Sequence, residues 1–108
     1  MLHDPLPGYM IKKVRWGSDG LVEAVLWQRA APIGMGRWAG QEEEVVVSQV
    51  IDALRRGEAV SLWFDEPGGT LLGPRVELVA DSLGREGIHA VDPEPGRDLE
   101  DVPRMTPT

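Results

Sequence analysis

Apolar and polar residues alternate along two early stretches of the chain, and this pattern predicts a β-hairpin. The stretches are residues 9–16 and 21–29, and Gly17-Ser18-Asp19-Gly20 separates them. An Asp-Gly pair directly before a new apolar run is typical of a tight turn, because glycine adopts positive φ without steric cost. We therefore expect two antiparallel neighbouring strands here.

Each predicted strand has a feature of its own. In a regular strand Ile11 and Val14 would face opposite sides, so we expect a bulge near Lys12-Lys13 that turns both inward. Residues 21–29 are mostly apolar on both sides. That pattern is typical of a strand that is central or covered on both faces.

A short helix is predicted in the middle of the chain. Val50, Ile51 and Leu54 share one face at helical spacing, Ser48 is suited to the N-cap, and Gly57 is suited to the first position after the helix. The residues expected to point outward are Gln49, Asp52, Arg55 and Arg56. A helix of this length is marginal alone and must be held by packing.

Acidic and β-branched residues precede this helix. Glu42-Glu43-Glu44 would stabilise a helix N-terminus through the macrodipole, which explains the run without an acid–base role. The following residues 45–47 are three valines, which favour an extended backbone.

The second half of the chain predicts further strands and a tail. Residues 59–64, 75–80 and 88–91 carry strand patterns, with Val60, Leu62 and Phe64 facing one way in the first of them. Turn residues fill the gaps between them, around Pro67-Gly68 and over 81–87. From Asp92 the chain is rich in proline and acidic residues, and we expect an irregular tail pinned by Leu99, Val102 and Met105.

These elements predict a single α+β domain over residues 1–108. We expect a mainly antiparallel sheet of four to five strands with one short helix, in the order β-β-α-β-β-β. The alternative is a small β-barrel capped by the helix. Residues 1–8 are expected to be an irregular lead-in, residues 30–43 a long loop and residues 92–108 an irregular tail.

The charge distribution argues against nucleic acid as a partner. The net charge is −7, with +2 over residues 1–40, −5 over 41–80 and −4 over 81–108. Nucleic-acid affinity depends largely on neutralising phosphates with Lys and Arg. The basic cluster Lys12-Lys13-Arg15 is better explained as the solvated side of a strand.

Composition also limits location and chemistry. The chain has no Cys, which removes disulfides, zinc–thiolate sites and Cys nucleophiles. It contains no apolar run near the ~18 residues of a membrane helix, and its first residues lack a secretory signal pattern. We expect a cytoplasmic protein with no membrane contact and no cofactor.

The sequence contains no strong pattern of catalytic residues. His3 and His89 are the two histidines, and neither lies near a nucleophile motif. The best metal-binding group is His89 with Asp92, Glu94 and, across the turn, Asp81. A single His among acidic residues is more often plain surface, so the sequence favours a non-enzymatic protein.

The long loop holds the best binding candidates. Met35, Arg37 and Trp38 stand among glycines within residues 30–43, and Trp is enriched at interaction hot spots. The alternative is that Trp38 folds back over an edge of the core. Trp16 and Trp27 flank the hairpin and are expected to be cross-strand neighbours.

Several short motifs, spread over about residues 9–105, resemble a family. They are the hairpin start Ile11-x-x-Val14-Arg15, the helix Val50-Ile51-x-x-Leu54-x-x-Gly57, the strand Val76-x-Leu78-Val79, the strand 88–92 and the ending Asp98-Leu99-x-x-Val102-Pro103. In this order they resemble a bacterial family of small uncharacterised proteins catalogued as a domain of unknown function. Its ending reads D-N-L-x-x-L-P, so this chain departs from it at the Asn and at the last Leu.

The resemblance implies an order of elements and no activity. It implies that the tail around Leu99 and Val102 docks on the body of the protein, and that residues 30–43 are an insertion. Together with the absent catalytic motifs, this favours a non-enzymatic interaction or accessory module that binds a protein partner or a second copy. The alternative is a small metal-dependent hydrolase using His89 and Asp92.

Overall fold

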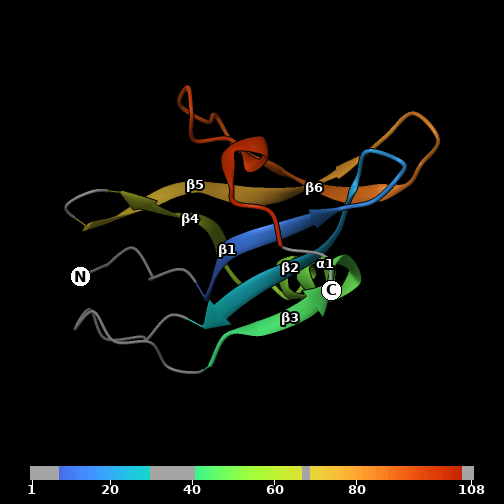
Figure 1. Cartoon of the computed structure of the whole chain (residues 1–108). Coiled ribbons are helices and arrows are strands. Elements are labelled where there is room, and N and C mark those ends of the chain that lie inside the picture. The colour runs from blue at the N-terminus through green and yellow to red at the C-terminus, as the bar shows by residue number, and fades with distance from the viewer. Residues whose placement is uncertain (1–7, 30–40, 67–68, 106–108) are drawn as a thin grey trace, which may run out of the picture.

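The computed structural model describes residues 8–29, 41–66 and 69–105. They form one helix and a six-stranded sheet in the spatial order β3-β2-β1-β4-β5-β6 (Figure 1). The elements are β1 (Tyr9–Trp16), β2 (Val22–Arg29), β3 (Glu43–Val46), α1 (Val47–Arg55), β4 (Val60–Glu66), β5 (Gly69–Ala80), β6 (Glu86–Ala90) and the 3₁₀ turn η1 (Leu99–Asp101).

The α+β class with one helix is confirmed, but the sheet has six strands where four to five were predicted, and it is mixed, because one of its five pairings is parallel. The sheet is open, so the alternative of a β-barrel is not supported. The extra strand is β3, which pairs antiparallel with β2 from Glu43↔Trp27 to Val46↔Ala24. The parallel pair is β1 with β4, from Tyr9↔Val60 to Ile11↔Leu62. The β2–β3 and β1–β4 pairings each join segments that are far apart in the sequence. The alternation of apolar and polar residues within one strand does not show which other strand it pairs with.

The N-terminal hairpin forms as predicted. Gly20 has φ of 81°, and Gly17 N–H donates to the Leu21 carbonyl at 2.7 Å. The β1–β2 register shifts between Ile11 and Lys13, which confirms the bulge. As a result, both Ile11 and Val14 are fully buried.

The helix ends as predicted but begins differently. Its N-cap is Val46, which makes no side-chain cap hydrogen bond, so the prediction of Ser48 as the cap is wrong. At the other end Gly57 has φ of 86° and donates to the Leu54 carbonyl, while Glu58 donates to the Ala53 carbonyl. These two bonds form a Schellman motif.

The acidic run before the helix does not act on the helix terminus. Glu44 lies in β3, where its carboxylate accepts a hydrogen bond from Arg15 at 2.9 Å. Glu42 forms an ion pair with Lys12 at 3.6 Å. The pairing of β3 with β2 therefore brings the side chains of Glu42 and Glu44 to basic residues of β1, and not to the helix N-terminus.

The sheet curves around α1. The helix contacts β2 and also β6, which are far apart in the strand order. Arg55 in its last turn is hydrogen-bonded to Glu86 on β6. One continuous core fills the curve; its fully buried members are Ile11, Val14, Val25, Val50, Ala53, Val60 and Leu62.

β5 is longer than predicted and contains an irregularity. It begins at Gly69, opposite Glu66 of β4, and the register shifts between Ser61 and Trp63. Pro74 lies at this irregularity, where a strand tolerates a residue without an N–H donor. At Gly73 a Cβ atom would lie only 2.7 Å from the Phe64 ring, so the ring needs a glycine opposite it.

The C-terminal tail docks on the sheet, as predicted. Leu99 and Val102 are buried, and Asp98 caps η1 through its side chain. Val14 N–H donates to the Pro103 carbonyl at 3.0 Å, and Met105 N–H donates to the Val14 carbonyl at 2.9 Å. The tail thus pairs with β1 beyond Ile11, where the pairing of β1 with β4 ends (Figure 1).

Candidate functional site

A cleft of about 310 Å³ lies between α1 and the β1–β2–β3 end of the sheet. Its lining residues are Tyr9, Trp27, Glu43, Val45, Gln49, Asp52 and Arg56. The sheet supplies the first four, α1 supplies Gln49 and Asp52, and Arg56 is the C-cap residue of the helix. The cleft is open to solvent on one side and joins aromatic, amide and charged groups.

The helical wall follows from spacing. Gln49, Asp52 and Arg56 are three and four residues apart, so they form one stripe along α1. The sequence pattern identifies them only as outward-pointing. Their role as a wall depends on β3, because this unpredicted strand widens the sheet beside the helix.

The aromatic floor is a stacked pair. The rings of Tyr9 and Trp27 lie with centroids 3.9 Å apart and planes 13° apart. Arg29 donates a hydrogen bond to the Tyr9 hydroxyl at 3.0 Å, and its guanidinium lies 5.3 Å from the centre of that ring. These contacts position the Tyr9 ring over Trp27, whose side chain is 5% exposed.

The stacked pair replaces the predicted pairing of tryptophans. Trp16 lies opposite Val22, and Trp27 lies opposite Ile11, so Trp16 and Trp27 are not cross-strand neighbours. Counting outward from the turn gives the same result, because Trp16 lies at the turn end of β1 whereas Trp27 lies near the far end of β2. Tyr9, two positions from Ile11 on the same side, takes the place beside Trp27.

The charges of the cleft are unevenly matched. Arg56 donates to Glu58 at 2.7 Å, and this hydrogen bond raises the pKa of Arg56 above its usual value. Glu58 also lies 3.7 Å from Arg29. Among the residues that the structure describes, the carboxylates of Glu43 and Asp52 make no hydrogen bond and no ion pair. Asp52 nevertheless interacts electrostatically with the Arg56 guanidinium, so the described lining carries two negative side chains and one positive side chain.

A second, smaller hollow of about 150 Å³ lies between the tips of the β1–β2 and β5–β6 hairpins. Trp16, Leu21, Val22, Val79 and Ile88 give it an apolar lining. The indole N–H of Trp16 is buried without a hydrogen-bond partner. That atom is out of reach of solvent, so a ligand in the hollow would not meet it.

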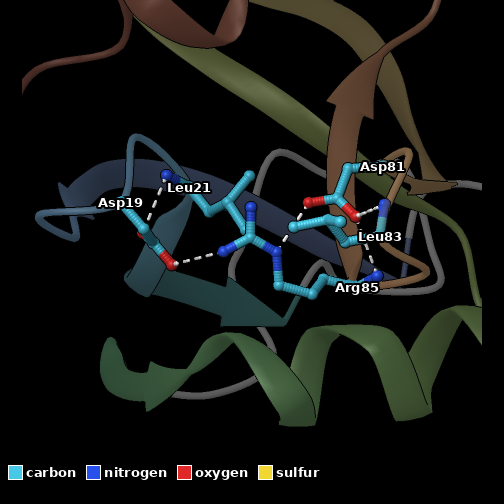
Figure 2. Close-up of polar contacts among 5 residues, drawn as sticks. All are labelled: Asp19, Leu21, Asp81, Leu83 and Arg85. Carbon is cyan, nitrogen blue, oxygen red and sulfur yellow. Dashed lines mark hydrogen bonds and ion pairs between the residues drawn. The ribbon is translucent and has the colours of Figure 1, made fainter.

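Arg85 bridges the two hairpins beside this hollow (Figure 2). Its guanidinium lies 2.7 Å from Asp81 and 3.8 Å from Asp19. Asp81 also accepts the backbone N–H groups of Arg85 and Leu83, each at 2.9 Å. The hydrogen bond from the Arg85 backbone, followed by those from its side chain and from Leu83, lowers the pKa of Asp81. The contact with Asp19 is the one that links the two hairpins among these groups, and as a half-exposed ion pair it contributes little to stability.

The binding residues predicted from the sequence, Met35, Arg37 and Trp38, lie outside the described residues. The chain leaves β2 at Arg29 and is described again from residue 41, two positions before β3 begins at Glu43. Glu43 lines the cleft and pairs with Trp27 in its floor. The predicted segment is thus joined at both ends to strands that border the cleft.

The predicted metal group is spread out. His89 has an exposed side chain on β6, opposite Glu77, and Asp92 is exposed with φ of 43° in the next turn. Within residues 8–29, 41–66 and 69–105 there is no group of three or more His, Cys, Asp or Glu side chains placed to hold a metal ion. A hydrolase site at His89 and Asp92 stays a prediction.

The basic cluster of β1 is interleaved with acids. Arg15 donates to Glu23 at 2.7 Å and to Glu44 at 2.9 Å, and both bonds raise the pKa of Arg15. The Nζ atom of Lys12 lies 5.3 Å from the ring centre of Trp63. In the part of the chain that is described, no helix has the length and apolar character needed to cross a membrane.

The fold and the cleft define a small α+β protein with an open, six-stranded mixed sheet curved around one helix. Comparison with known protein families, with curated proteins and with solved structures gave no match.

Proposed function

We propose that this protein is a non-enzymatic interaction module of the cytoplasm, and that the cleft between α1 and the sheet is its recognition site. The observation that carries the proposal is a cleft to which both the sheet and the helix contribute exposed carboxylates, Glu43 and Asp52, beside the stacked rings of Tyr9 and Trp27. Among the described residues the carboxylates of Glu43 and Asp52 accept no hydrogen bond and form no close ion pair, although Asp52 interacts electrostatically with Arg56. An incoming ligand or partner would supply the missing contacts.

The segment over residues 30–43 supports the same site. It connects β2 to β3, both of which line the cleft, and it carries Met35, Arg37 and Trp38. An aromatic residue and an arginine are the types that most often carry interface binding energy. We propose a protein partner, with a second copy of the chain as the alternative occupant.

The resemblance to the bacterial domain of unknown function fits this proposal without adding an activity. The short motifs that carry it fall on elements of the scaffold. Residues 30–43, which look like an insertion relative to that family, are the part joined to the cleft. An accessory module that gains a partner through an inserted segment would show this arrangement.

Partner capture with matched variants tests the proposal. Immobilised full-length wild type, Trp38→Ala, Asp52→Asn and Glu77→Gln would be compared by quantitative mass spectrometry, with sedimentation velocity to detect self-association. Glu77→Gln is the control, because Glu77 is an exposed carboxylate of β5 away from the cleft. We expect wild type and Glu77→Gln to capture the same set of proteins or to form a dimer. Trp38→Ala and Asp52→Asn should show neither association. Association that is the same for all four proteins would overturn the proposal.

A further inference from the structure

We propose that the neighbouring tips of the β1–β2 and β5–β6 hairpins form a surface through which two copies of this chain associate. The proposal goes beyond the proposed function, because this surface shares no described lining residue with the cleft. It rests on an exposed leucine, on the hollow beside it and on the charges around both.

The tips hold an exposed apolar patch. Among the described residues, the large apolar side chains that are exposed are Val46, Val79 and Leu83, at 51%, 43% and 77%. Val46 lies on β3 at the opposite edge of the sheet, whereas Val79 and Leu83 lie at the end of β5 and in the turn that follows it. We define the tip patch as Val79, Leu83 and the partly buried Trp16 and Leu21.

The turn that carries Leu83 is held by backbone groups and by Asp81. The Asp81 backbone N–H donates to the Arg85 carbonyl, and the Asp81 carbonyl accepts from Gly84, each at 2.9 Å. The Asp81 carboxylate accepts the N–H groups of Leu83 and Arg85, also at 2.9 Å. The turn therefore presents the leucine side chain to solvent without using it. Apolar residues that gather on one exposed surface are typical of interaction sites.

The hollow has the size of the side chain that it would receive. It measures about 150 Å³, and the other three members of the tip patch line it. Leu83 follows and precedes two further lining residues, Asp81 and Arg85, so it lies at the rim. An apolar cavity of about 150 Å³ accommodates benzene, and the four-carbon side chain of leucine is no larger.

One surface thus carries both a projecting leucine and a hollow that fits one. A two-fold axis beside the tips would place each Leu83 in the hollow of the other copy. This is the self-complementary arrangement of an isologous dimer. Figure 2 shows Leu21 and Leu83 on the two turns with Arg85 between them, so both hairpins would contribute to the contact.

The charges at the tips also suit a second copy. The chain carries a net charge of −7, which opposes self-association over most of its surface. At the tips, however, Arg85 lies 2.7 Å from Asp81 and 3.8 Å from Asp19. Arg85 and Asp19 are both half-exposed. In the two-fold dimer each Arg85 can therefore pair with the Asp19 of the other copy.

The contact is expected to be weak. The tips offer fewer residues than the roughly 20–30 per side of a standard interface, so we expect a dissociation constant on the order of 0.1–1 mM. Such a contact is populated where copies are held at millimolar effective concentration on one assembly.

Dilution of the ¹⁵N-labelled full-length chain from about 1 mM to about 0.05 mM tests the proposal, because this range spans the expected dissociation constant. The readouts are the amide resonances of Leu21, Val79 and Leu83 and the translational diffusion coefficient. We expect shifts in wild type that fit one monomer–dimer equilibrium. Leu83→Ser should weaken dimerisation at least about tenfold, because two leucines per dimer lose their apolar surface. Val46→Ser is the matched control and should dimerise like wild type.

A spin label locates the contact. The chain has no Cys, so Glu77→Cys gives a single attachment point two residues before Val79. Unlabelled copies that carry the nitroxide would be mixed with ¹⁵N-labelled wild type. We expect the resonances of Leu21, Val79 and Leu83 to broaden, while Val46 stays sharp.

Three results would overturn the proposal. They are shifts that do not depend on concentration up to about 1 mM, equal weakening by Val46→Ser and Leu83→Ser, and broadening that is strongest outside the tips. Leu83 is exposed, and an amide spectrum of Leu83→Ser that otherwise matches wild type would show that the variant folds.

The result is separable from the test of the proposed function. At about 10 µM the tip contact is almost unpopulated, so partner capture and sedimentation at that concentration report on the cleft. Leu83→Ser should keep partner capture, and Asp52→Asn should keep the contact between tips.

Discussion

The ring of Tyr9 on β1 lies on the ring of Trp27 on β2, with centroids 3.9 Å apart. This contact joins the start of the first strand to the end of the second and forms the floor of the cleft. Tyr9→Ala should lower the free energy of unfolding by about 1–3 kcal/mol, because it removes a ring from a packed pair. Tyr9→Phe keeps the ring and loses only an exposed hydrogen bond from Arg29, so a change within about 0.5 kcal/mol is expected. Urea unfolding measures both, and equal losses would contradict the importance of the stack.

Gly73 lies under the ring of Phe64. A methyl group at this position would lie 2.7 Å from the ring and 3.1 Å from the Leu62 Cβ atom. Gly73→Ala should therefore destabilise the protein by about 1–3 kcal/mol through overpacking. Gly87→Ala is the matched control, because a Cβ atom at Gly87 would have no neighbour within 4 Å among the described residues. We expect Gly87→Ala to be neutral or slightly stabilising; thermal unfolding of the two variants that agrees within error would refute the overpacking.

Val102 anchors the C-terminal tail. It is 2% exposed, and Val102→Ala should cost about 1–2 kcal/mol through lost burial and the cavity left behind. The exposed Glu100→Ala should change stability by no more than about 0.5 kcal/mol. Hydrogen exchange gives a second readout: the Val14 amide, bonded to the Pro103 carbonyl, should exchange faster in Val102→Ala. Unchanged Val14 protection would show that the tail is held elsewhere.

Ser48 lies inside the helix, where the structure gives it no capping role. Ser48→Ala should leave the free energy of unfolding unchanged or raise it by up to about 0.5 kcal/mol, because Ala has the better helix propensity. If Ser48 were the N-cap, the same change would cost about 1 kcal/mol. Denaturant unfolding at neutral pH distinguishes the two outcomes.

Asp81 makes stability depend on pH. Its pKa is lowered in the folded protein, chiefly by the hydrogen bond from the Arg85 backbone. A lowered folded-state pKa contributes stability that is present above the unfolded-state pKa, about 3.9. This stability is lost as the pH falls through the folded-state pKa. Wild type should therefore be more stable than Asp81→Asn at pH 7, and the difference should shrink below about pH 4. A difference that stays constant between pH 7 and pH 3 would contradict this role.

The local features of the fold follow closely from the sequence. The Gly17–Gly20 turn, the bulge near Lys12 and the stop at Gly57 each depend on the backbone preferences of a few adjacent residues. Val60, Leu62 and Phe64 are all buried, as their alternation predicts. The docking of Leu99 and Val102 was also expected, from the apolar positions in the tail and from the resemblance to the domain of unknown function.

The candidate site could be predicted only in part. The outward positions of Gln49, Asp52 and Arg56 follow from helical spacing, but nothing in that spacing says what lies opposite them. The missing element is β3, whose Glu43 and Glu44 resemble residues that precede a helix. Their pairing with β2 turns Glu43 toward the cleft, while Glu44 binds Arg15.

The sequence by itself determined the turns, the bulge, the end of the helix and the buried side of β4, because each of these depends on near neighbours and on the alternation of side chains. Only the tertiary structure decided the parallel pairing of β1 with β4, the place of β3 at the sheet edge, and the meeting of Glu43 with Asp52 across a cleft. These depend on which distant segments pair, and backbone hydrogen bonds between strands are nearly independent of side-chain identity. The physical origin of the site is therefore the strand order of the sheet.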